Sequence, residues 1–364
     1  MVVKTGLRGR FPVKYLGVPL VSSRLIYRDC NELIEKVQRR VNDWKNKSLS
    51  TAGRLQLIQS VVSSLHVYWA SVFILPTRIL LDIEQIMRGF LWCHGNMRRG
   101  MAKVAWEDVC LPIDEGGLGI RRLVRDLIAH GQFTWPQEWL SKYPTLVTIN
   151  APILCDGVPD SLVWKGRLGI AKRFSVYSVW NDLRPGDAKV NWYDIIWFPA
   201  YIPRHALNLW LIIRRRLKTQ DKLRAWDNVD WLNLKCALCK LQPDSHEHLF
   251  FDCSFAQQVW NRVKDLAGLS NPSPSMDDIL HDIAPFAKRR TLKSIVAKLV
   301  VVAAAFFIWQ ERNGRLFKES KLSVSQVSDN ILNSVRLKLM SCRIKKSRSA
   351  LELLHRWKIS DSIL

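Results

Sequence analysis

The stretch Cys236-Ala-Leu-Cys239, followed after eight residues by His248-Leu-Phe-Phe-Asp-Cys253, brings three thiols and one imidazole within eighteen residues. Two of the thiols are separated by two residues, a spacing with which one tight turn presents both sulfurs to the same ion. A tetrahedral zinc ion takes four such ligands, and the thiolates neutralise its charge. Four protein ligands leave no open position for water or substrate, so the spacing predicts a structural zinc site.

Two alternatives stay open for this stretch. One is that the cysteines are reduced, buried residues of an intracellular protein, with His248 as a core histidine. The other concerns which imidazole takes part, because His246 lies only two residues from His248 and the two would point apart on a strand. The spacing from His248 to Cys253 closes a short loop, and it therefore favours His248.

Length, composition and charge restrict the class of protein. A chain of 364 residues is long enough for two or three domains with real cores, and 48% hydrophobic residues argue against broad disorder. The 55 Lys and Arg against 32 Asp and Glu give a formal charge of +23. This excess favours a polyanionic partner, most simply RNA or DNA. The alternative is basic surface that meets another part of a larger protein.

Features that bear on compartment point to a cytosolic or nuclear protein. The other five cysteines form no pattern, and basic residues, not an apolar signal segment, follow Met1. The longest apolar run, from Leu299 to Trp309, is too short to span a bilayer and is preceded by Lys298. We expect it to be a buried helix and expect no membrane partner.

The apolar periodicity predicts a mainly α-helical chain. Ser50 and Thr51 are suited to cap a helix that Pro76 ends, and Pro203 begins another helix that we expect to continue through Leu217. The remaining helices are expected over about 29–44, 77–94, 255–266, 291–317 and 323–344. Residues 116–119, Gly-Gly-Leu-Gly, are expected to form a loop and do not fit a dinucleotide-binding fingerprint.

The middle of the chain carries a series of motifs in a specific order. They are Leu162-Val163-Trp164-Lys165, Phe174-Ser175-Val176, Trp197-Phe198, Ile202-Pro203-Arg204-His205, Leu217-Lys218-Thr219 and then the cysteine and histidine stretch as far as Trp260. This order resembles the zinc-binding domain at the C-terminal end of plant LINE-type (non-LTR) retrotransposon reverse transcriptases. The resemblance implies zinc as the cofactor and Cys236, Cys239, His248 and Cys253 as its ligands, with His246 a bystander.

The flanking regions are similar to the same elements. Residues 15–20, 44–45, 49–54 and 116–120 resemble the segment after the polymerase palm, and Ile308-Trp309-Gln310-Glu311-Arg312-Asn313 resembles the tail after the zinc domain. The resemblance implies a thumb-like helical unit over 1–125, a small zinc-stabilised α-rich domain over 161–264 and a helical basic tail over 265–364. The mixed, proline-containing residues 126–160 are expected to form a linker between the first two.

The chain also departs from that family. The polymerase motif, an aromatic residue and Ala followed by two aspartates, is absent, and Asp82, Asp108 and Asp114 are isolated. Metal-dependent nucleotidyl transfer needs carboxylates that hold two cations close together. We therefore expect a non-catalytic C-terminal remnant and not an enzyme. The alternatives are a zinc-stabilised protein-interaction module and, less favoured, part of an active RNA-directed DNA polymerase.

Nucleic-acid contacts are expected from the basic residues that crowd the segment before the zinc motif. These are Arg214, Arg215, Arg216, Lys218, Lys222 and Arg224. A rival explanation is that some of them pair with acidic groups such as Asp221 or Asp227 and only hold the domain together. The sequence does not specify a protein partner or a choice between RNA and DNA.

Overall fold

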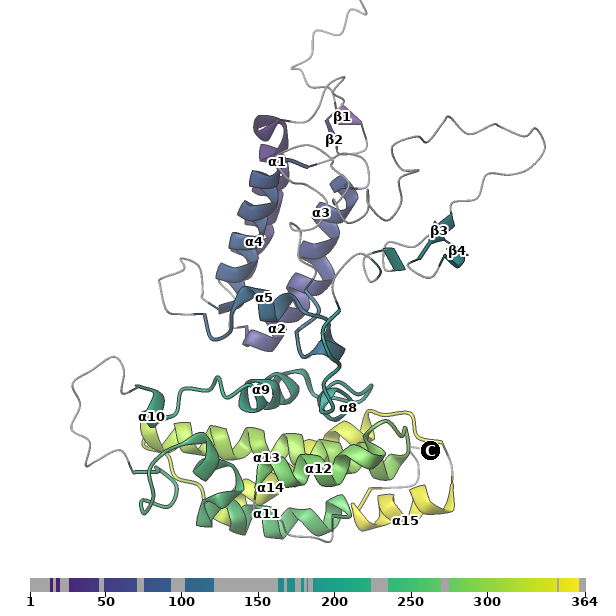
Figure 1. Ribbon diagram of the computed structural model, residues 1–364. Helices are drawn as coiled ribbons and strands as arrows, with labels where there is room; N and C mark the ends of the chain where they lie inside the picture. The colour runs from purple at the N-terminus through teal and green to yellow at the C-terminus, as the bar shows by residue number, and fades with distance from the viewer. Residues whose placement is uncertain are drawn as a thin grey trace, which may run out of the picture.

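The computed structural model in Figure 1 shows an elongated molecule built almost entirely of helices. It describes residues 14–15, 18–19, 26–45, 49–70, 75–92, 102–120, 163–166, 169–173, 178–179, 182, 186–223, 235–269, 275–345 and 347–359. The described strands form two short antiparallel hairpins, β1 with β2 and β3 with β4. The predicted fold class, mainly α, is therefore confirmed.

The elements follow one another along the chain as two groups. The first group comprises β1 (Lys14–Tyr15), β2 (Val18–Pro19), α1 (Asn31–Lys45), α2 (Thr51–Leu57), α3 (Ser63–Ala70), α4 (Thr77–Trp92) and α5 (Trp106–Cys110). The second comprises β3 (Val163–Lys165), β4 (Ala171–Arg173), α8 (Tyr193–Ile196), α9 (Pro203–Ile213), α10 (Gln220–Leu223), α11 (Ser254–Ala267), α12 (Met276–Ala287), α13 (Leu292–Phe317), α14 (Val324–Met340) and α15 (Arg348–Arg356).

The N-terminal helices form where the sequence pattern predicts them. The Ser50 side chain accepts a hydrogen bond from the amide of Gly53 and caps α2, which continues through a π-helical turn at Ile58–Val62 into α3. Helices α1 and α4 lie side by side and bury the apolar positions that recur at helical spacing. Those positions include Leu33, Val37, Ile83 and Met87, all fully buried.

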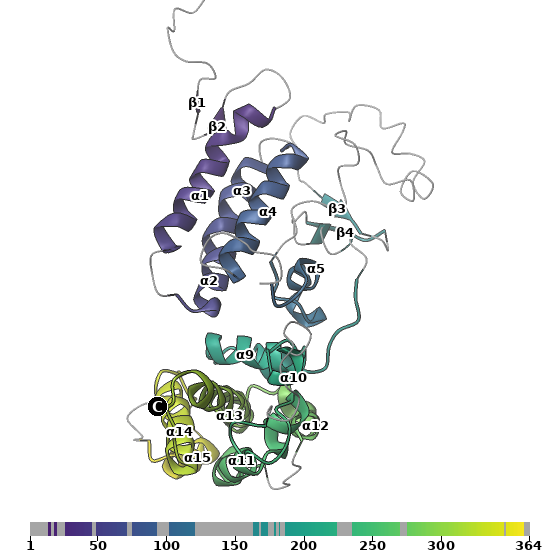
Figure 2. The same cartoon turned by 90° about the vertical axis from the view of Figure 1, so that its left-hand side faces the viewer.

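Helix α9 connects the N-terminal helices to the rest of the molecule. It packs against α2 on one side and α13 on the other, as both views show (Figures 1 and 2). A helix covered on two sides needs apolar residues around most of its circumference. Accordingly, every residue from His205 to Ile212 is buried.

The glycine-rich loop makes close contact with the end of α9. Gly116 has a φ of 92°, and its carbonyl oxygen accepts hydrogen bonds from the Trp210 indole (2.8 Å) and the Arg214 guanidinium (2.7 Å). A side chain at Gly117 would lie 2.0 Å from the carbonyl oxygen of Leu111, so only glycine fits there. The loop over 116–119 therefore links the segment that follows α5 to the C-terminal end of α9, which lies much later in the sequence.

Helix α13 is the central helix of the second group. It contacts α8, α9, α11, α12, α14 and α15 (Figure 1). By length and composition it is the one described helix apolar enough to cross a membrane, but 67% of its apolar window is buried inside the protein. The expectation of a buried helix around 299–309 is confirmed.

The buried lysine of α13 is accommodated by protein groups. The Lys298 ammonium donates to the carbonyl oxygen of Ala287 at the end of α12 (2.8 Å) and lies 4.6 Å from the centre of the Phe198 ring. Burial lowers the pKa of Lys298. These two contacts replace the water that the ammonium group loses on burial, as a buried charged group requires.

The helices after residue 264, expected as a tail, pack directly on the zinc region. Both α13 and α14 contact α11, and α15 contacts α13. The expected linker over 126–160 lies outside the described residues. The domain boundaries remain predictions, but the packing shows that α11, α13 and α14 share one core.

The Pro203 helix ends earlier than the periodicity suggested. It was expected to reach Leu217, but α9 ends at Ile213. The Arg215 amide donates to Ile212 and the Arg216 amide to Leu211, with Arg215 in the left-handed region (φ 52°). This is a Schellman-type helix end. Arg215 and Arg216 therefore lie beyond the helix and not on its polar side.

Candidate metal centre

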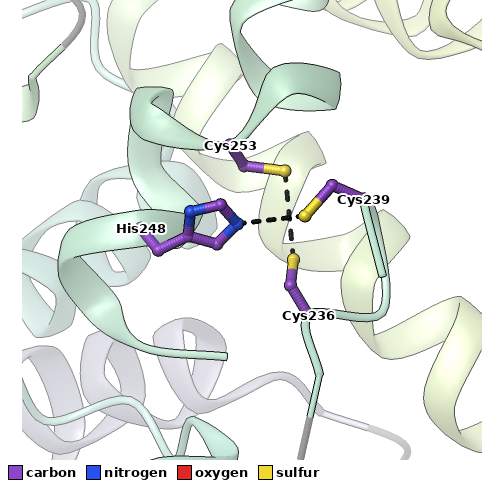
Figure 3. A group of neighbouring side chains, drawn as sticks. All are labelled: Cys236, Cys239, His248 and Cys253. Carbon is purple, nitrogen blue, oxygen red and sulfur yellow. Dashed lines mark hydrogen bonds between the residues drawn. The ribbon is translucent and has the colours of Figure 1, made fainter. Parts of the chain in front are cut away.

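Four potential metal ligands converge beside α11 and α13. They are Cys236, Cys239, His248 and Cys253, and their ligand atoms all lie within 4.8 Å of one another (Figure 3). The Cys236 and Cys253 sulfurs are 3.9 Å apart, and the Cys239 sulfur is 3.2 Å from Nε2 of His248. Zinc bonded tetrahedrally at ordinary lengths places its sulfurs about 3.8 Å apart and sulfur and nitrogen about 3.6 Å apart. The arrangement fits zinc.

The first two cysteines are held by a tight turn. The Cys236 amide donates to the carbonyl of Gln242 (2.7 Å), and the Lys240 amide donates to the carbonyl of Cys236 (2.8 Å). Lys240 is in the left-handed region (φ 60°), which reverses the chain directly after Cys239. The turn places both sulfurs on one side, as their two-residue spacing predicted.

The second pair of ligands is set by a distorted helical turn at His248–Asp252. Within it Phe251 has a φ of 77°, a conformation that is strained for an aromatic residue. The Phe251 ring is fully buried and lies 5.0 Å from the Trp260 ring, centre to centre. This packing fixes the distortion, which turns the chain so that Cys253, immediately before α11, faces His248.

The pKa values of two buried thiols are shifted in opposite directions. The contact with Cys253 and burial raise the pKa of the Cys236 thiol, whereas the same contact lowers the pKa of Cys253. A divalent ion that binds both as thiolates displaces protons, so its affinity falls with decreasing pH.

Helix α13 supports the cysteine turn from outside. The Arg315 guanidinium donates to the carbonyl oxygen of Leu238 (2.9 Å) and is held by Glu311 (2.6 Å). Arg315 also lies over the Phe255 ring, 4.5 Å from its centre. Because Leu238 lies between the two cysteines of the turn, Arg315 holds the peptide that presents their sulfurs.

A buried ion pair joins α13 to the segment between the ligands. Arg312 pairs with Asp244, and the two side chains are 1% and 0% exposed. Asp244 also accepts a hydrogen bond from the amide of Gln220 (2.8 Å). Both charges are therefore compensated, which a buried pair requires.

The rival histidine lies outside the cluster. Nε2 of His246 is 3.0 Å from the carbonyl oxygen of Leu217, and the side chain is buried. Burial lowers the pKa of His246, so the neutral ring donates this hydrogen bond. His246 and His248 lie on a helical turn and not on a strand, and only His248 belongs to the group of four.

The predicted nucleic-acid contacts are partly used within the protein. Arg214 is 3.4 Å from Asp108 and binds Gly116, while Arg215 is 3.0 Å from Glu247. The Lys222 ammonium donates to the carbonyl of Arg215. Arg216 and Lys218 are exposed, and Arg224 lies outside the described residues. The acidic partner Asp108 is 106 residues from Arg214 and was not among those expected.

Comparisons with known proteins agree with this geometry. Residues 174–260, which contain all four candidate ligands, match the family described as zinc-binding in reverse transcriptase. An Arabidopsis thaliana protein named as a ribonuclease H protein is 38% identical over 421 aligned residues, covering 83% of this chain and 66% of that protein. No solved structure matches the chain. The matched domain, the zinc-suited cluster and the plant relative together indicate a retrotransposon-derived protein that carries the zinc-binding domain of reverse transcriptases.

Proposed function

We propose that the chain is a non-catalytic, C-terminal part of a LINE-type reverse transcriptase that uses structural zinc to hold a nucleic-acid-binding surface. The observation that carries the proposal is the Cys3His cluster inside the segment that matches the reverse transcriptase zinc-binding family. A closed set of three thiolates and one imidazole fits a structural ion, because it leaves no site for a reacting water. The formal charge of +23 supports a polyanionic partner.

The arrangement of the carboxylates supports the non-catalytic part of the proposal. Asp82 binds the Tyr27 hydroxyl (2.9 Å), Asp108 pairs with Arg214, and Asp114 lies 3.1 Å from Lys189. Each of these three carboxylates thus interacts with a different residue, and no two of them share a partner. In the part of the chain that the structure describes, the only group of three or more His, Cys, Asp or Glu side chains placed to share a metal is the Cys3His cluster.

Ribonuclease H activity is a second candidate, which the name of the Arabidopsis protein raises. The present chain spans 66% of that protein, so the name does not by itself assign the activity. Two-metal hydrolysis of a nucleic-acid backbone requires neighbouring carboxylates that hold both cations. The described carboxylates favour the non-catalytic reading over this one.

A third candidate is a zinc-stabilised module that binds a protein. The internal pairing of Arg214 and Arg215 favours it, because those cations are partly committed to holding the fold. The two binding hypotheses differ in salt dependence. Each cation that neutralises a phosphate displaces condensed counterions, and log affinity then falls with log salt by roughly 0.7–0.9 per contact.

The test uses the purified full chain loaded with zinc. Zinc content is measured by mass spectrometry, and affinity for a fluorescein-labelled RNA and its DNA counterpart is measured by anisotropy over a series of salt concentrations. We expect one zinc per chain and a steep salt slope. A slope near zero would reject nucleic-acid binding, and primer extension or RNA cleavage by homogeneous protein with magnesium or manganese would reject the non-catalytic assignment.

A further inference from the structure

A large basic groove lies at the opposite end of α13 from Arg312 and Arg315, and it is lined by none of the residues predicted to contact nucleic acid. It has a volume of about 1140 Å³ and is bounded by the end of α11, the beginning of α13, the end of α14 and α15. Figure 1 labels these helices. The groove exceeds the usual size of a small-molecule pocket, so an extended ligand suits it better.

The charge of the groove is strongly one-sided. Its lining includes two acidic residues, Asp265 and Glu352, and six basic ones. The basic residues are Arg290, Lys293, Lys338, Arg343, Lys345 and Arg356. Glu352 already pairs with Arg348 (3.3 Å), a cation outside this set. The groove thus has an excess of four positive charges, or five when the Glu352 pair is taken into account.

The six cations differ from the predicted basic segment in their partners. Arg214 and Arg215 have acidic partners, whereas none of the six forms an ion pair with any other residue the structure describes. Five of them are exposed, and Lys338 is half-buried. Like charges gathered without compensation repel one another, so an anionic ligand would relieve that repulsion.

The remaining lining residues indicate what kind of anion fits. Apolar side chains such as Leu266, Ile295 and Leu353 form part of the wall, and walls of low dielectric focus the field of surrounding charges. None of the described residues that line the groove is aromatic, so they provide no ring on which an unpaired base could stack. The charge and the lack of stacking rings among these residues therefore favour contacts to phosphates over contacts to bases.

We propose that this groove binds the phosphate backbone of a nucleic-acid strand without sequence preference. The inference rests on the proposed function, and it moves the main contact surface from the segment before the metal cluster to the junction of α11, α13, α14 and α15. The first residues of α13 line the groove as well, and the positive end of that helix dipole adds to the attraction of phosphate.

The test compares three variants that each lose three positive charges. The first is the groove variant Lys293→Gln/Arg343→Gln/Lys345→Gln. The second is the segment variant Arg216→Gln/Lys218→Gln/Lys222→Gln. The third is a control with exposed cations elsewhere, Arg39→Gln/Arg40→Gln/Lys321→Gln. Binding to labelled oligo(U) RNA and to a mixed-sequence RNA duplex is measured against salt, and circular dichroism and zinc content establish that each variant is folded.

We expect the groove variant to reduce the salt slope by about 2–3, at roughly 0.7–0.9 per lost contact. The segment and control variants should each change the slope by less than one contact's worth. Equal losses in all three variants would overturn the groove as a site, and so would a loss confined to the segment variant. If the unaltered protein shows no salt-dependent RNA binding, the proposed function itself fails.

The same variants separate nucleic acid from other anions. Inorganic phosphate and vesicles containing phosphatidylserine serve as competitors against the labelled RNA. We expect RNA to be displaced by unlabelled duplex and only weakly by phosphate. Vesicle binding that the groove variant loses, with unchanged RNA binding, would show that the groove is a membrane-surface site and would refute the proposal.

Discussion

The N-terminal helices and the metal-centred region fold by different physical means. Helices α1 and α4 bury apolar side chains, including Leu33 and Ile83, against each other, and these side chains recur at helical spacing within each helix. The metal-centred region instead combines thiols, a histidine and the buried pair of Asp244 with Arg312. Local periodicity in the sequence is therefore enough to predict the structure where buried apolar area stabilises the fold. It is not enough where the fold depends on charged residues that lie far apart in the sequence.

The difference has an energetic reason. Eighteen residues from Cys236 to Cys253 are too few to bury a self-sufficient core, so this segment depends on a ligand and on α13. Buried charges stabilise only when both partners are present, because an unpaired charge in the interior carries its full desolvation penalty. Removing one component should therefore affect the metal region severely and the N-terminal helices little.

Removing a metal ligand should give the largest effect. Structural zinc contributes about 10–16 kcal/mol of apparent binding energy in small zinc domains, and that energy is coupled to folding. We expect Cys239→Ala and His248→Ala to lower zinc content to near zero by mass spectrometry and to increase hydrogen exchange around 235–260.

The matched control for this prediction is His246→Ala, which should lose its hydrogen bond to Leu217 yet keep the metal. The N-terminal helices should keep their exchange rates in all three variants. Zinc retained in His248→Ala and lost in His246→Ala would show that the ligand assignment is wrong.

Breaking the buried ion pair should give the next largest effect. Arg312→Met leaves Asp244 buried without its cation, which typically costs about 3–5 kcal/mol. We expect a lower unfolding midpoint in denaturant for the metal region. Arg348→Met is the control, because its pair with Glu352 is exposed and such pairs contribute about 0–1 kcal/mol. Equal midpoint shifts in the two variants would contradict the role given to Asp244 and Arg312.

A cavity in the N-terminal helices tests the comparison from the other side. Ile83 is fully buried, and Ile83→Ala should cost about 2–5 kcal/mol through lost packing and the cavity left behind. Exchange should increase in α1 and α4, while zinc content stays at the unaltered value. Leu81→Ala, at a half-exposed position on the same helix, should have little effect. Loss of zinc in Ile83→Ala would show that the two regions do not fold separately.

Acidic pH should produce a smaller, graded effect through His205 at the junction. Its ring is 1% exposed, has no hydrogen-bond partner among the described residues and stacks on Phe306 at 4.2 Å. Burial, aided by Arg204, lowers the pKa of His205 to about 3. The folded state thus binds fewer protons than the unfolded state between about pH 6.5 and 3, so stability falls as pH falls through that range.

At about pH 5 this single group should cost up to roughly 2 kcal/mol. His205→Phe, which keeps a ring against Phe306, should flatten the decline measured by denaturant unfolding at several pH values. Zinc content is followed in the same samples, so that loss of metal in acid is separated from protonation of His205. An unchanged pH profile in the variant would remove His205 as the cause.

Local signals in the sequence predicted much of the fold. Ser50, which was predicted to cap a helix, caps α2, and the helix expected over about 291–317 is found as α13. The four clustered side chains were likewise named from short spacings and the resemblance. Helix α12 was not identified, although Ser275 caps it and Asp277 follows, because Pro285 interrupts the helical pattern.

Long-range pairing was not predictable in the same way. Nothing in the spacing of Asp244 and Arg312, 68 residues apart, indicates that they meet. The same holds for Arg214 with Asp108, so a cation that was expected to contact nucleic acid also forms an ion pair within the protein. Exposure of a charge depends on which elements pack together, and that information is absent from local patterns.

The position of Arg312 along the chain also has a consequence for synthesis. The segment with Asp244 leaves the ribosome before α13 exists, and at about 5–20 residues per second its partner follows only after roughly 3–14 s. During that interval Asp244 has no arginine to neutralise it and the cysteine turn lacks its brace. Nascent chains should therefore expose their thiols to alkylating reagents or chaperones until α13 is made, and zinc uptake during translation would shorten that vulnerable period.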